Sequence, residues 1–284
     1  MGAPWQDHPS WRVVSTISDA TGRDVGALLV EADAETLRAT RNAQLAAFSL
    51  SMVILDAARA AGLSGEGAVA GHSLGEYSAL VAAGAASLEE GARLVAARGD
   101  AMQAAADAAP GTMAAVLGLE PEEVARVCGK VEGAWLANDN APGQVVLAGT
   151  AAGVAAAGEA ALALGAKRVL PLVVGGAFHS PLMAAAQERL DAALAAASFG
   201  PSRIPLVANV DAAAHSEGWA DLLSAQLVSR VRWRESLLTL ARMGATRFVE
   251  LGPGTEMSGM VRRTVEGASR SNVATPDDLG GLLA

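Results

Sequence analysis

Apolar positions recur with helical spacing along much of the first hundred residues, and short apolar runs separate these stretches. Helices are predicted over 36–61, 74–83 and 88–107. The run EGAVA at 66–70 is bounded by glycines and predicts a buried strand. Ser87 and Glu90 have the spacing of a capping box, which places the start of the longest helix.

The rhythm changes between 109 and 174, where the elements become shorter. In order, they are a strand at 111–118, a helix at 121–131, strands at 134–137 and 144–149, a helix at 150–165 and a strand at 167–172. This order is that of the ferredoxin-like split motif. Because the larger alternation resumes afterwards, we interpret 109–174 as an inserted ferredoxin-like subdomain.

The remaining elements complete an alternating pattern of strands and helices. Helices are predicted at 181–197, 218–228, 231–242 and from 255, strands at 204–209 and 247–251, and loop with one closing turn at 269–284. The alternation predicts the α/β class. Residues 1–108 and 175–284 are expected to form a body with a parallel sheet.

Composition narrows the possible functions without choosing one. The 284 residues can bury a large core in one or two domains, and the hydrophobic share of 51% with only 4% aromatic residues suits alanine-rich helices packed closely on a sheet. A net charge of −9 argues against nucleic-acid binding. The single cysteine, Cys128, is expected in the core and fits a reduced, cytoplasmic setting. No signal peptide, membrane span or metal-binding spacing is visible.

GHSLGEYSAL at 71–80 places Ser73 between Gly71 and Gly75, where a strand is predicted to turn into a helix. This G-x-S-x-G pattern is typical of a nucleophile elbow, whose tight turn leaves no room for flanking side chains. The N–H of Leu74 then points to where an oxyanion forms. A purely structural turn is the alternative, and the flanking strand and helix favour the nucleophile.

His179, in GGAFHSPLM, is the candidate base for the serine. Ser180 and Pro181 have the residue types of an N-cap and a first helical position. We expect the positive helix start to disfavour imidazolium and to keep His179 neutral. A histidine that only caps the helix is the alternative. His72 is expected on the opposite side of the strand, in a structural role.

Arg98 lies in an apolar stripe, because Leu94 and Met102 precede and follow it at helical spacing, while Arg93 is expected on the wet face. A buried guanidinium needs a partner. That partner is either an internal carboxylate or the carboxylate of a substrate, held by the two-pronged guanidinium.

With Ser73, Arg98 and His179, the chain resembles the malonyl-CoA:acyl-carrier-protein transacylases, the acyltransferase family of fatty-acid and polyketide synthesis. The segments that carry the resemblance are GHSLGEYSAL, RGDAMQ, NDNAPGQVVLAG, GAFHSPLM, QLVSRVRW and ELGPGTEMSGMVRR. They run in family order from about 34 to 265. The resemblance implies an α/β-hydrolase-like body with a ferredoxin-like subdomain.

The resemblance also implies roles for individual residues. Ser73 is similar to the acyl-accepting nucleophile and His179 to its general base. Leu74 N–H is similar to one oxyanion donor, and Gln226 would orient His179 through its backbone carbonyl.

Three further residues are assigned to substrate binding. Arg98 would bind the malonyl carboxylate, and Phe178 before the histidine is typical of members that take malonyl rather than methylmalonyl groups. Met102, on the same helix face as Arg98, is the third.

Two features depart from the family pattern. Arg230 stands where proline is usual. The family also opens with a strand and a P-G-Q-G loop whose glutamine supplies the second oxyanion donor, whereas MGAPWQDHPS resembles the sequence just after that loop. We expect a start site assigned too late, with a genuine variant lacking the loop as the alternative.

The implied reaction is ping-pong malonyl transfer from malonyl-CoA to the phosphopantetheine thiol of an acyl carrier protein, through a malonyl-serine. No cofactor or metal is expected, the partners are malonyl-CoA and the carrier protein, without nucleic acid or membrane, and the protein is expected to be a cytoplasmic monomer. Lys167–Arg168 and Arg262–Arg263 are candidate docking cations. The rivals are a thioester hydrolase with the same Ser–His pair and a non-catalytic docking partner.

Overall fold

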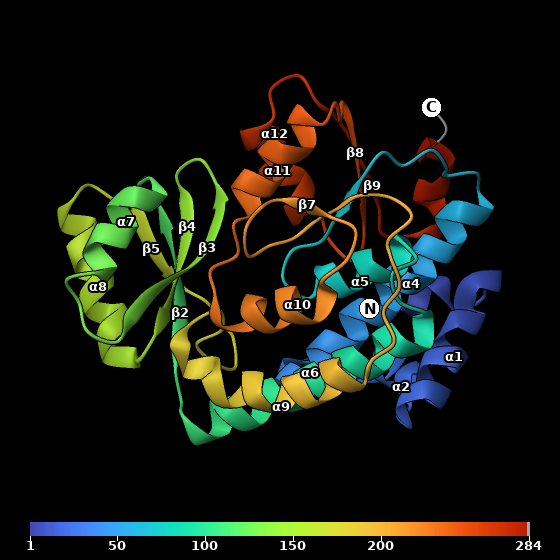
Figure 1. Cartoon of the computed structure of the whole chain (residues 1–284), viewed down its shortest axis with the longest axis horizontal. Helices are drawn as coiled ribbons and strands as arrows, with labels where there is room; N and C mark the ends of the chain where they lie inside the picture. Colours follow the sequence, from blue (N-terminus) through green and yellow to red (C-terminus); the bar gives the residue numbers. More distant parts are fainter. Residues whose placement is uncertain (283–284) are drawn as a thin grey trace.

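A computed structural model of the chain describes residues 1–282 (Figure 1). The first part is mostly helical. Its elements are the 3-10 turns η1 (Ala3–Trp5) and η2 (Pro9–Trp11), the helices α1 (Arg12–Thr21), α2 (Val25–Val30), α3 (Ala34–Arg38) and α4 (Thr40–Ala60), the strand β1 (Val69–Ala70), and the helices α5 (Gly75–Ala82) and α6 (Leu88–Ala108). The helix predicted over 36–61 is broken at Ala39, whose ψ of 124° is not helical. The strand predicted over 66–70 is limited to its last two residues.

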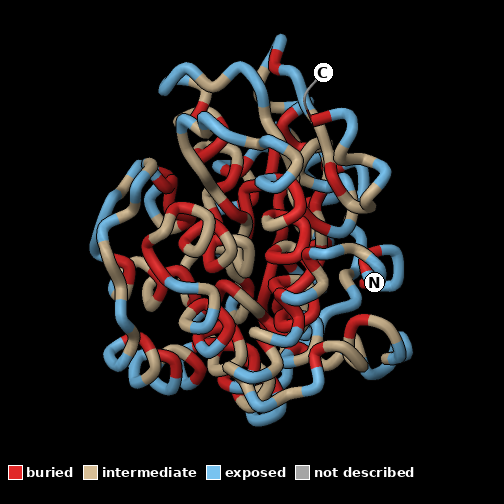
Figure 2. The backbone as a smooth tube through the Cα atoms, turned by 90° about the vertical axis from the view of Figure 1, so that its right-hand side faces the viewer, coloured by how far each residue is buried: buried red, intermediate tan, exposed pale blue. Residues whose placement is uncertain are grey.

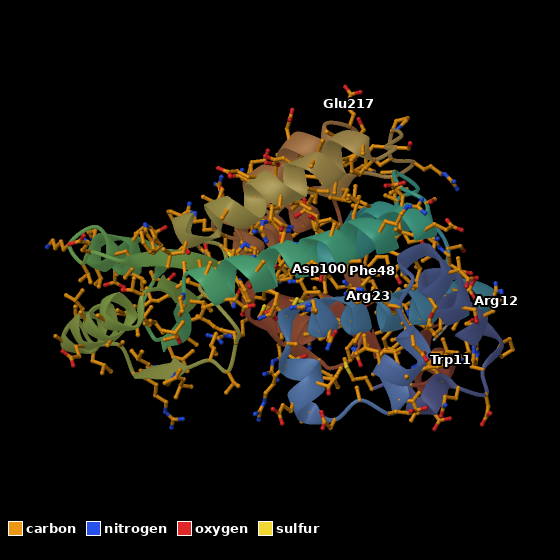
Figure 3. All side chains as sticks on the ribbon, turned by 90° about the horizontal axis from the view of Figure 1, so that it is seen from below. Trp11, Arg12, Arg23, Phe48, Asp100 and Glu217 are labelled. Carbon is orange, nitrogen blue, oxygen red and sulfur yellow. The ribbon has the colours of Figure 1, made fainter. Side chains whose placement is uncertain are left out.

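The helices α4 and α6 lie at the centre of the main hydrophobic core (Figure 3). Phe48 of α4 is fully buried. Gly91 of α6 lets the two helices approach closely at this residue, because a Cβ there would lie 3.1 Å from the Phe48 ring. At the surface, Arg23 reaches across from the turn after α1 to Asp100 of α6 at 2.5 Å.

The middle of the chain forms a separate antiparallel sheet with two helices. Its elements are β2 (Thr112–Leu117), α7 (Pro121–Cys128), β3 (Ala134–Ala141), β4 (Gln144–Gly149), α8 (Ala151–Ala163) and β5 (Arg168–Pro171). The strand order β3-β4-β2-β5 is ferredoxin-like, and the sheet packs on α7 and α8 over its own core. The predicted order of elements is therefore confirmed. We propose 109–174 as the limits of this subdomain.

The last part of the chain returns to the body. Its elements are η3 (Pro181–Met183), α9 (Ala184–Ala196), β6 (Leu206–Val207), β7 (Ala214–His215), α10 (Trp219–Val228), α11 (Trp233–Arg242), β8 (Arg247–Leu251), α12 (Glu256–Thr264), β9 (Ser269–Val273) and η4 (Pro276–Leu282). The loop predicted for 269–284 is wrong at its start, because β9 pairs in parallel with β8. Residues 283–284 of that prediction lie outside the described residues.

The parallel strands of the body form two separate sheets. In one, β1 pairs in parallel with β6, and β7 runs antiparallel beside β6. The other is the β8–β9 pair. The α/β class with parallel pairing is confirmed, and the expectation of one body sheet is replaced by these two. Figure 2 shows the buried backbone gathered along the middle of the molecule, with exposed segments around it.

Among the described residues, α4 is the one helix that is long and apolar enough to cross a bilayer. Within its most apolar window, 67% of the residues are buried inside the protein. Its apolar surface is therefore largely used by the core that it forms with α6.

Candidate active site

Ser73 stands at the turn between β1 and α5 in a strained conformation, with a φ of 51°. Gly71 is required by this turn, because a Cβ there would lie 1.9 Å from the carbonyl oxygen of Gly75. A Cβ on Gly75 itself would meet nothing within 4 Å. The expected elbow is present, but only the first of its two glycines is demanded by close contact.

His179 meets the serine from another part of the chain. Its Nε2 lies 2.7 Å from Ser73 Oγ, and its Nδ1 lies 3.0 Å from the carbonyl oxygen of Gln226. Because a carbonyl only accepts, Nδ1 carries the proton and Nε2 is free to accept one from the hydroxyl. Ser180 caps the η3 turn through the N–H of Leu182, as expected.

Burial, followed by the positive charge of Arg98, lowers the pKa of His179 to about 3. The ring is therefore neutral near pH 7, as a base has to be. The expectation of a neutral imidazole agrees with this direction. Loss of solvent around the ring is the largest cause of the lowered pKa, and the contribution expected from the start of the following helix stays a prediction.

Arg98 of α6 is 1% exposed and points at the serine. Its Nη2 donates to Ser73 Oγ at 3.1 Å and to Gln226 Oε1 at 3.2 Å. Nη1 donates to Gln44 Oε1 at 2.6 Å. Nε is buried without an acceptor, and within residues 1–282 no carboxylate forms an ion pair with this guanidinium. The internal carboxylate considered as its partner is thus not found.

The other predicted site residues lie at the edges of this cluster. Leu74 follows the serine, and no acceptor in the described part of the chain takes its backbone N–H. Phe178 precedes the histidine and packs between two apolar clusters. Met102 lies behind the cluster, where its Sδ accepts a hydrogen bond from Gln44 Nε2 at 3.0 Å.

The acyl transferase domain family model matches residues 11–277. The chain belongs to the acyl transferase domain family. It is 42% identical to the malonyl CoA-acyl carrier protein transacylase of Bacillus subtilis (strain 168), over 90% of this chain and 82% of that protein. The corresponding Escherichia coli (strain K12) protein is 38% identical over 94% of this chain and 88% of its own length.

Solved structures agree with this family membership. An acyl-carrier-protein S-malonyltransferase from Burkholderia pseudomallei 1710b superposes with a TM-score of 0.94 at 38% identity, covering 99% of this chain and 94% of that one. A malonyl-transacylase in complex with a type II polyketide synthase acyl carrier protein gives 0.94 at 35% identity, covering 100% and 94%.

Three residues of this acyl transferase domain that the sequence analysis did not single out complete the cluster: Gln44, Glu76 and Asn209. Glu76 is 1% exposed and accepts hydrogen bonds from Gln226 Nε2 at 2.8 Å and from the N–H of Asn209 at 3.1 Å. Burial raises its pKa to about 7. Gln44 and Glu76 are polar residues on buried helix faces, the same signal that identified Arg98.

The second histidine of the elbow belongs to a different group. His72 Nε2 lies 2.8 Å from Asn140 Oδ1 and 3.3 Å from Asn138 Nδ2, and its ring packs edge-on against Trp233. Burial lowers its pKa. It bonds to β3 of the antiparallel sheet instead of to Ser73, in agreement with the expectation of a separate place.

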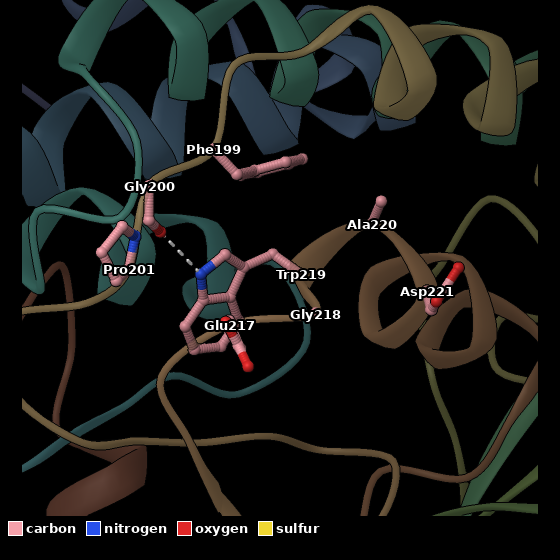
Figure 4. A pocket seen from close by; sticks show the side chains of 8 residues that line it. All are labelled: Phe199, Gly200, Pro201, Glu217, Gly218, Trp219, Ala220 and Asp221. Carbon is pink, nitrogen blue, oxygen red and sulfur yellow. Dashed lines mark hydrogen bonds between the residues drawn. The ribbon is translucent and has the colours of Figure 1, made fainter.

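The acyl transferase domain also has a surface cavity of about 310 Å³ away from Ser73 (Figure 4). Its wall includes Trp219, whose Nε1 donates to the carbonyl of Gly200 at 3.1 Å. It contains none of the residues of the Ser73 cluster. Among the described residues, no group of three or more His, Cys, Asp or Glu side chains could hold a metal ion.

Proposed function

We propose that this chain transfers a malonyl group from malonyl-CoA to the phosphopantetheine thiol of an acyl carrier protein by a ping-pong mechanism. The observation that carries the proposal is the geometry of Arg98. A buried guanidinium, with no carboxylate partner among the described residues, lies 3.1 Å from the hydroxyl that an adjacent neutral imidazole can deprotonate. Such a site suits an acyl group that ends in a carboxylate.

In the first half-reaction, His179 Nε2 takes the proton of Ser73 Oγ as the oxygen attacks the thioester carbonyl. The oxyanion is stabilised by the backbone N–H of Leu74, which has no competing acceptor in the described part of the chain. The C–S bond then breaks, and the imidazolium returns its proton to the departing sulfur of coenzyme A. The product is a malonyl ester of Ser73.

The second half-reaction repeats these steps with the carrier thiol as nucleophile. His179 accepts the thiol proton, the sulfur attacks the ester carbonyl, and the C–O bond to Ser73 breaks with return of the proton to Oγ. The bond from Nδ1 to the Gln226 carbonyl keeps one ring orientation through both halves.

Arg98 is already held in place before substrate arrives. Gln44 and Gln226 occupy one N–H each of Nη1 and Nη2, and the face of the Tyr77 ring lies 5.5 Å from the guanidinium carbon. Nε has no acceptor, and the Nη2 hydrogen that bonds to the serine hydroxyl can turn to another acceptor. Both N–H groups are therefore available to an incoming carboxylate. We propose that this carboxylate binds beside Ser73 and so places the thioester carbonyl next to Oγ.

Malonyl-CoA incubation followed by intact-protein mass spectrometry tests the function. We expect one malonyl adduct that is absent in Ser73→Ala and that added coenzyme A removes with return of malonyl-CoA. Rapid release of free malonate without that reversal would favour the hydrolase. The absence of any adduct would favour a non-catalytic docking partner and would contradict the proposal.

The same proposal includes a docking surface for the acidic carrier protein. Lys167 and Arg168 are exposed at the edge strand β5, next to Leu170 and Val173, which are 43% and 85% exposed. Arg263 of the other candidate pair instead donates to Gln144 and Pro142 at 2.6 Å. A surface that combines free cations with exposed apolar side chains suits an acidic protein partner.

Charge reversal tests this surface. We expect the double variant Lys167→Glu, Arg168→Glu to raise the KM for the carrier protein about tenfold while the KM for malonyl-CoA stays unchanged. Arg262→Glu, an exposed cation of the other pair, is the matched control. An equal effect of both changes would contradict this assignment. That the enzyme is a monomer, needs no cofactor and is cytoplasmic stays a prediction.

A further inference from the structure

The backbone of the nucleophile turn is held by one side chain from a distant part of the chain. Asn209 Oδ1 accepts a hydrogen bond from the N–H of Ser73 at 2.6 Å. Asn209 Nδ2 donates to the carbonyl of Gly71 at 2.8 Å. One amide group therefore bridges the polar backbone groups on either side of His72, where the strand leaves its regular conformation.

The position of Asn209 follows from the pairing of strands. Val69 and Ala70 of β1 pair in parallel with Leu206 and Val207 of β6. Asn209 comes two residues after β6, so its side chain takes over as partner of the chain where the β1 ladder stops. The residue is fully buried.

Asn209 is itself fixed by the surrounding backbone and by Glu76. Its N–H donates to Glu76 Oε2 at 3.1 Å, and its carbonyl accepts from the N–H of Arg232 at 3.0 Å. The orientation of the side-chain amide follows from its own two bonds, because only Oδ1 can accept from the N–H of Ser73 and only Nδ2 can donate to the carbonyl of Gly71.

We propose that Asn209 is a positioning residue for acyl transfer, which holds the strained turn so that Ser73 Oγ stays in line with His179. The inference rests on the proposed function for its substrate. Because Asn209 occupies the N–H of Ser73, the neighbouring N–H of Leu74 is the one left for the oxyanion. A carboxylate at this position could accept from Ser73 but would repel the Gly71 carbonyl, and alanine would leave both backbone groups unpaired.

The first test measures the single-turnover rate of Ser73 acylation in Asn209→Ala. We expect a loss on the order of 100-fold, because a misplaced nucleophile costs about that much. The loss should be equal for malonyl-CoA and acetyl-CoA, since Arg98 is untouched. In a Ser73→Ala background, the affinity for malonyl-CoA should be the same with Asn209 or alanine. Weakened affinity in that background would point to general unfolding and overturn the positioning role.

The second test uses Asn209→Asp and pH. When the carboxyl is protonated it can accept from Ser73 and donate to Gly71, as the amide does. We therefore expect the acylation rate of this variant, relative to the unsubstituted protein, to rise as the pH falls. A ratio that is independent of pH would contradict the proposal. Asp139→Asn is the control. It exchanges a carboxyl and an amide at a residue that is 1% exposed and lies outside the Ser73 cluster.

A nitrophenyl acetate ester as acyl donor separates this inference from the proposed function. If the unsubstituted protein reacts with that ester but not with malonyl-CoA, malonyl transfer is wrong, and the Asn209 effect is measured with the ester. If Asn209→Ala reacts with the ester at the rate of the unsubstituted protein, Asn209 does not position the serine. If Ser73 reacts with neither donor, both proposals are overturned.

Discussion

Replacing Arg98 with alanine tests whether the buried guanidinium selects acyl groups that end in a carboxylate. Within residues 1–282, the hydrogen-bond acceptors of its guanidinium are the neutral side chains of Gln44, Gln226 and Ser73. A substrate carboxylate that accepts two hydrogen bonds from it gains about 1.5–3 kcal/mol from each. Acetyl groups have no such acceptor, so the gain is a difference between substrates.

The sum of two such bonds, about 3–6 kcal/mol, corresponds to about 10²–10⁴ in relative rate, since each 1.36 kcal/mol is tenfold. We expect the lower end. A bound carboxylate would compete with the serine hydroxyl for Arg98 Nη2, and the loss of that bond would offset part of the gain. The preference for malonyl-CoA over acetyl-CoA should therefore fall about 100-fold in Arg98→Ala.

The assay is rapid-quench acylation of Ser73, with kcat/KM measured separately for malonyl-CoA and acetyl-CoA. The malonyl value should fall and the acetyl value should change little. Arg93→Ala is the matched control on the same helix, because this side chain is 52% exposed. In Arg98→Ala, Gln44 Oε1 and Gln226 Oε1 lose their hydrogen-bond donor. The thermal unfolding temperature of each variant shows whether this loss lowers stability. A ratio that is the same in Arg98→Ala and the unsubstituted protein would refute the role of the guanidinium.

Three further predictions concern the turn and the two titratable groups beside it. Gly71→Ala should abolish acylation while Gly75→Ala retains it, because only the first added Cβ meets backbone, at 1.9 Å; equal loss in both would contradict this in the same mass-spectrometric assay. The pH–rate profile of acylation should show no acid limb near pH 6.5 from His179, whose pKa is lowered to about 3, and histidine NMR should find its ring neutral at pH 6. The pKa of Glu76 is raised from 4.5 to about 7, so between these pH values the folded state binds a proton that the unfolded state has released. The contribution of this proton to stability is fully present below pH 4.5 and is lost as the pH rises through 7. Glu76→Gln should remove this loss, so the free energy of unfolding of the unsubstituted protein relative to the variant should fall between about pH 4.5 and 7; parallel curves in chemical denaturation would refute it.

The local motifs predicted the parts of the site that depend on a single element. The turn around Ser73 and the capped turn after His179 are recognisable because each needs particular residue types within a few positions. Arg98 was predicted to be buried from the apolar stripe of α6, and the structure finds it 1% exposed. Gln44 and Glu76 carry the same signal, a polar side chain on an apolar helix face, and could have been found by it.

Asn209 and β9 show where sequence patterns fail. Asn209 follows a strand of only two residues, and its partners lie more than 130 positions earlier in the chain, so no local pattern marks it. The residues SRSNV of β9 are mostly polar, with only Val273 buried, and lack the alternation expected of a strand. Their conformation is set by the parallel ladder along β8, a partner that only the fold brings into place.

Gln226 connects Arg98, which we propose binds the substrate carboxylate, with His179, which we propose transfers the proton, and the chemistry of its amide fixes the direction of its hydrogen bonds. Its Oε1 can only accept, so it takes the hydrogen bond of the Arg98 guanidinium at 3.2 Å, while Nε2 donates to the carboxylate of Glu76 at 2.8 Å. The amide thus stands between the buried guanidinium of Arg98 and the buried carboxyl of Glu76 and separates the two groups. Had Glu76 reached Arg98 itself, the guanidinium would be neutralised before any substrate arrived. Because the backbone carbonyl of the same residue also orients His179, a shift of Gln226 would disturb carboxylate recognition and proton transfer together.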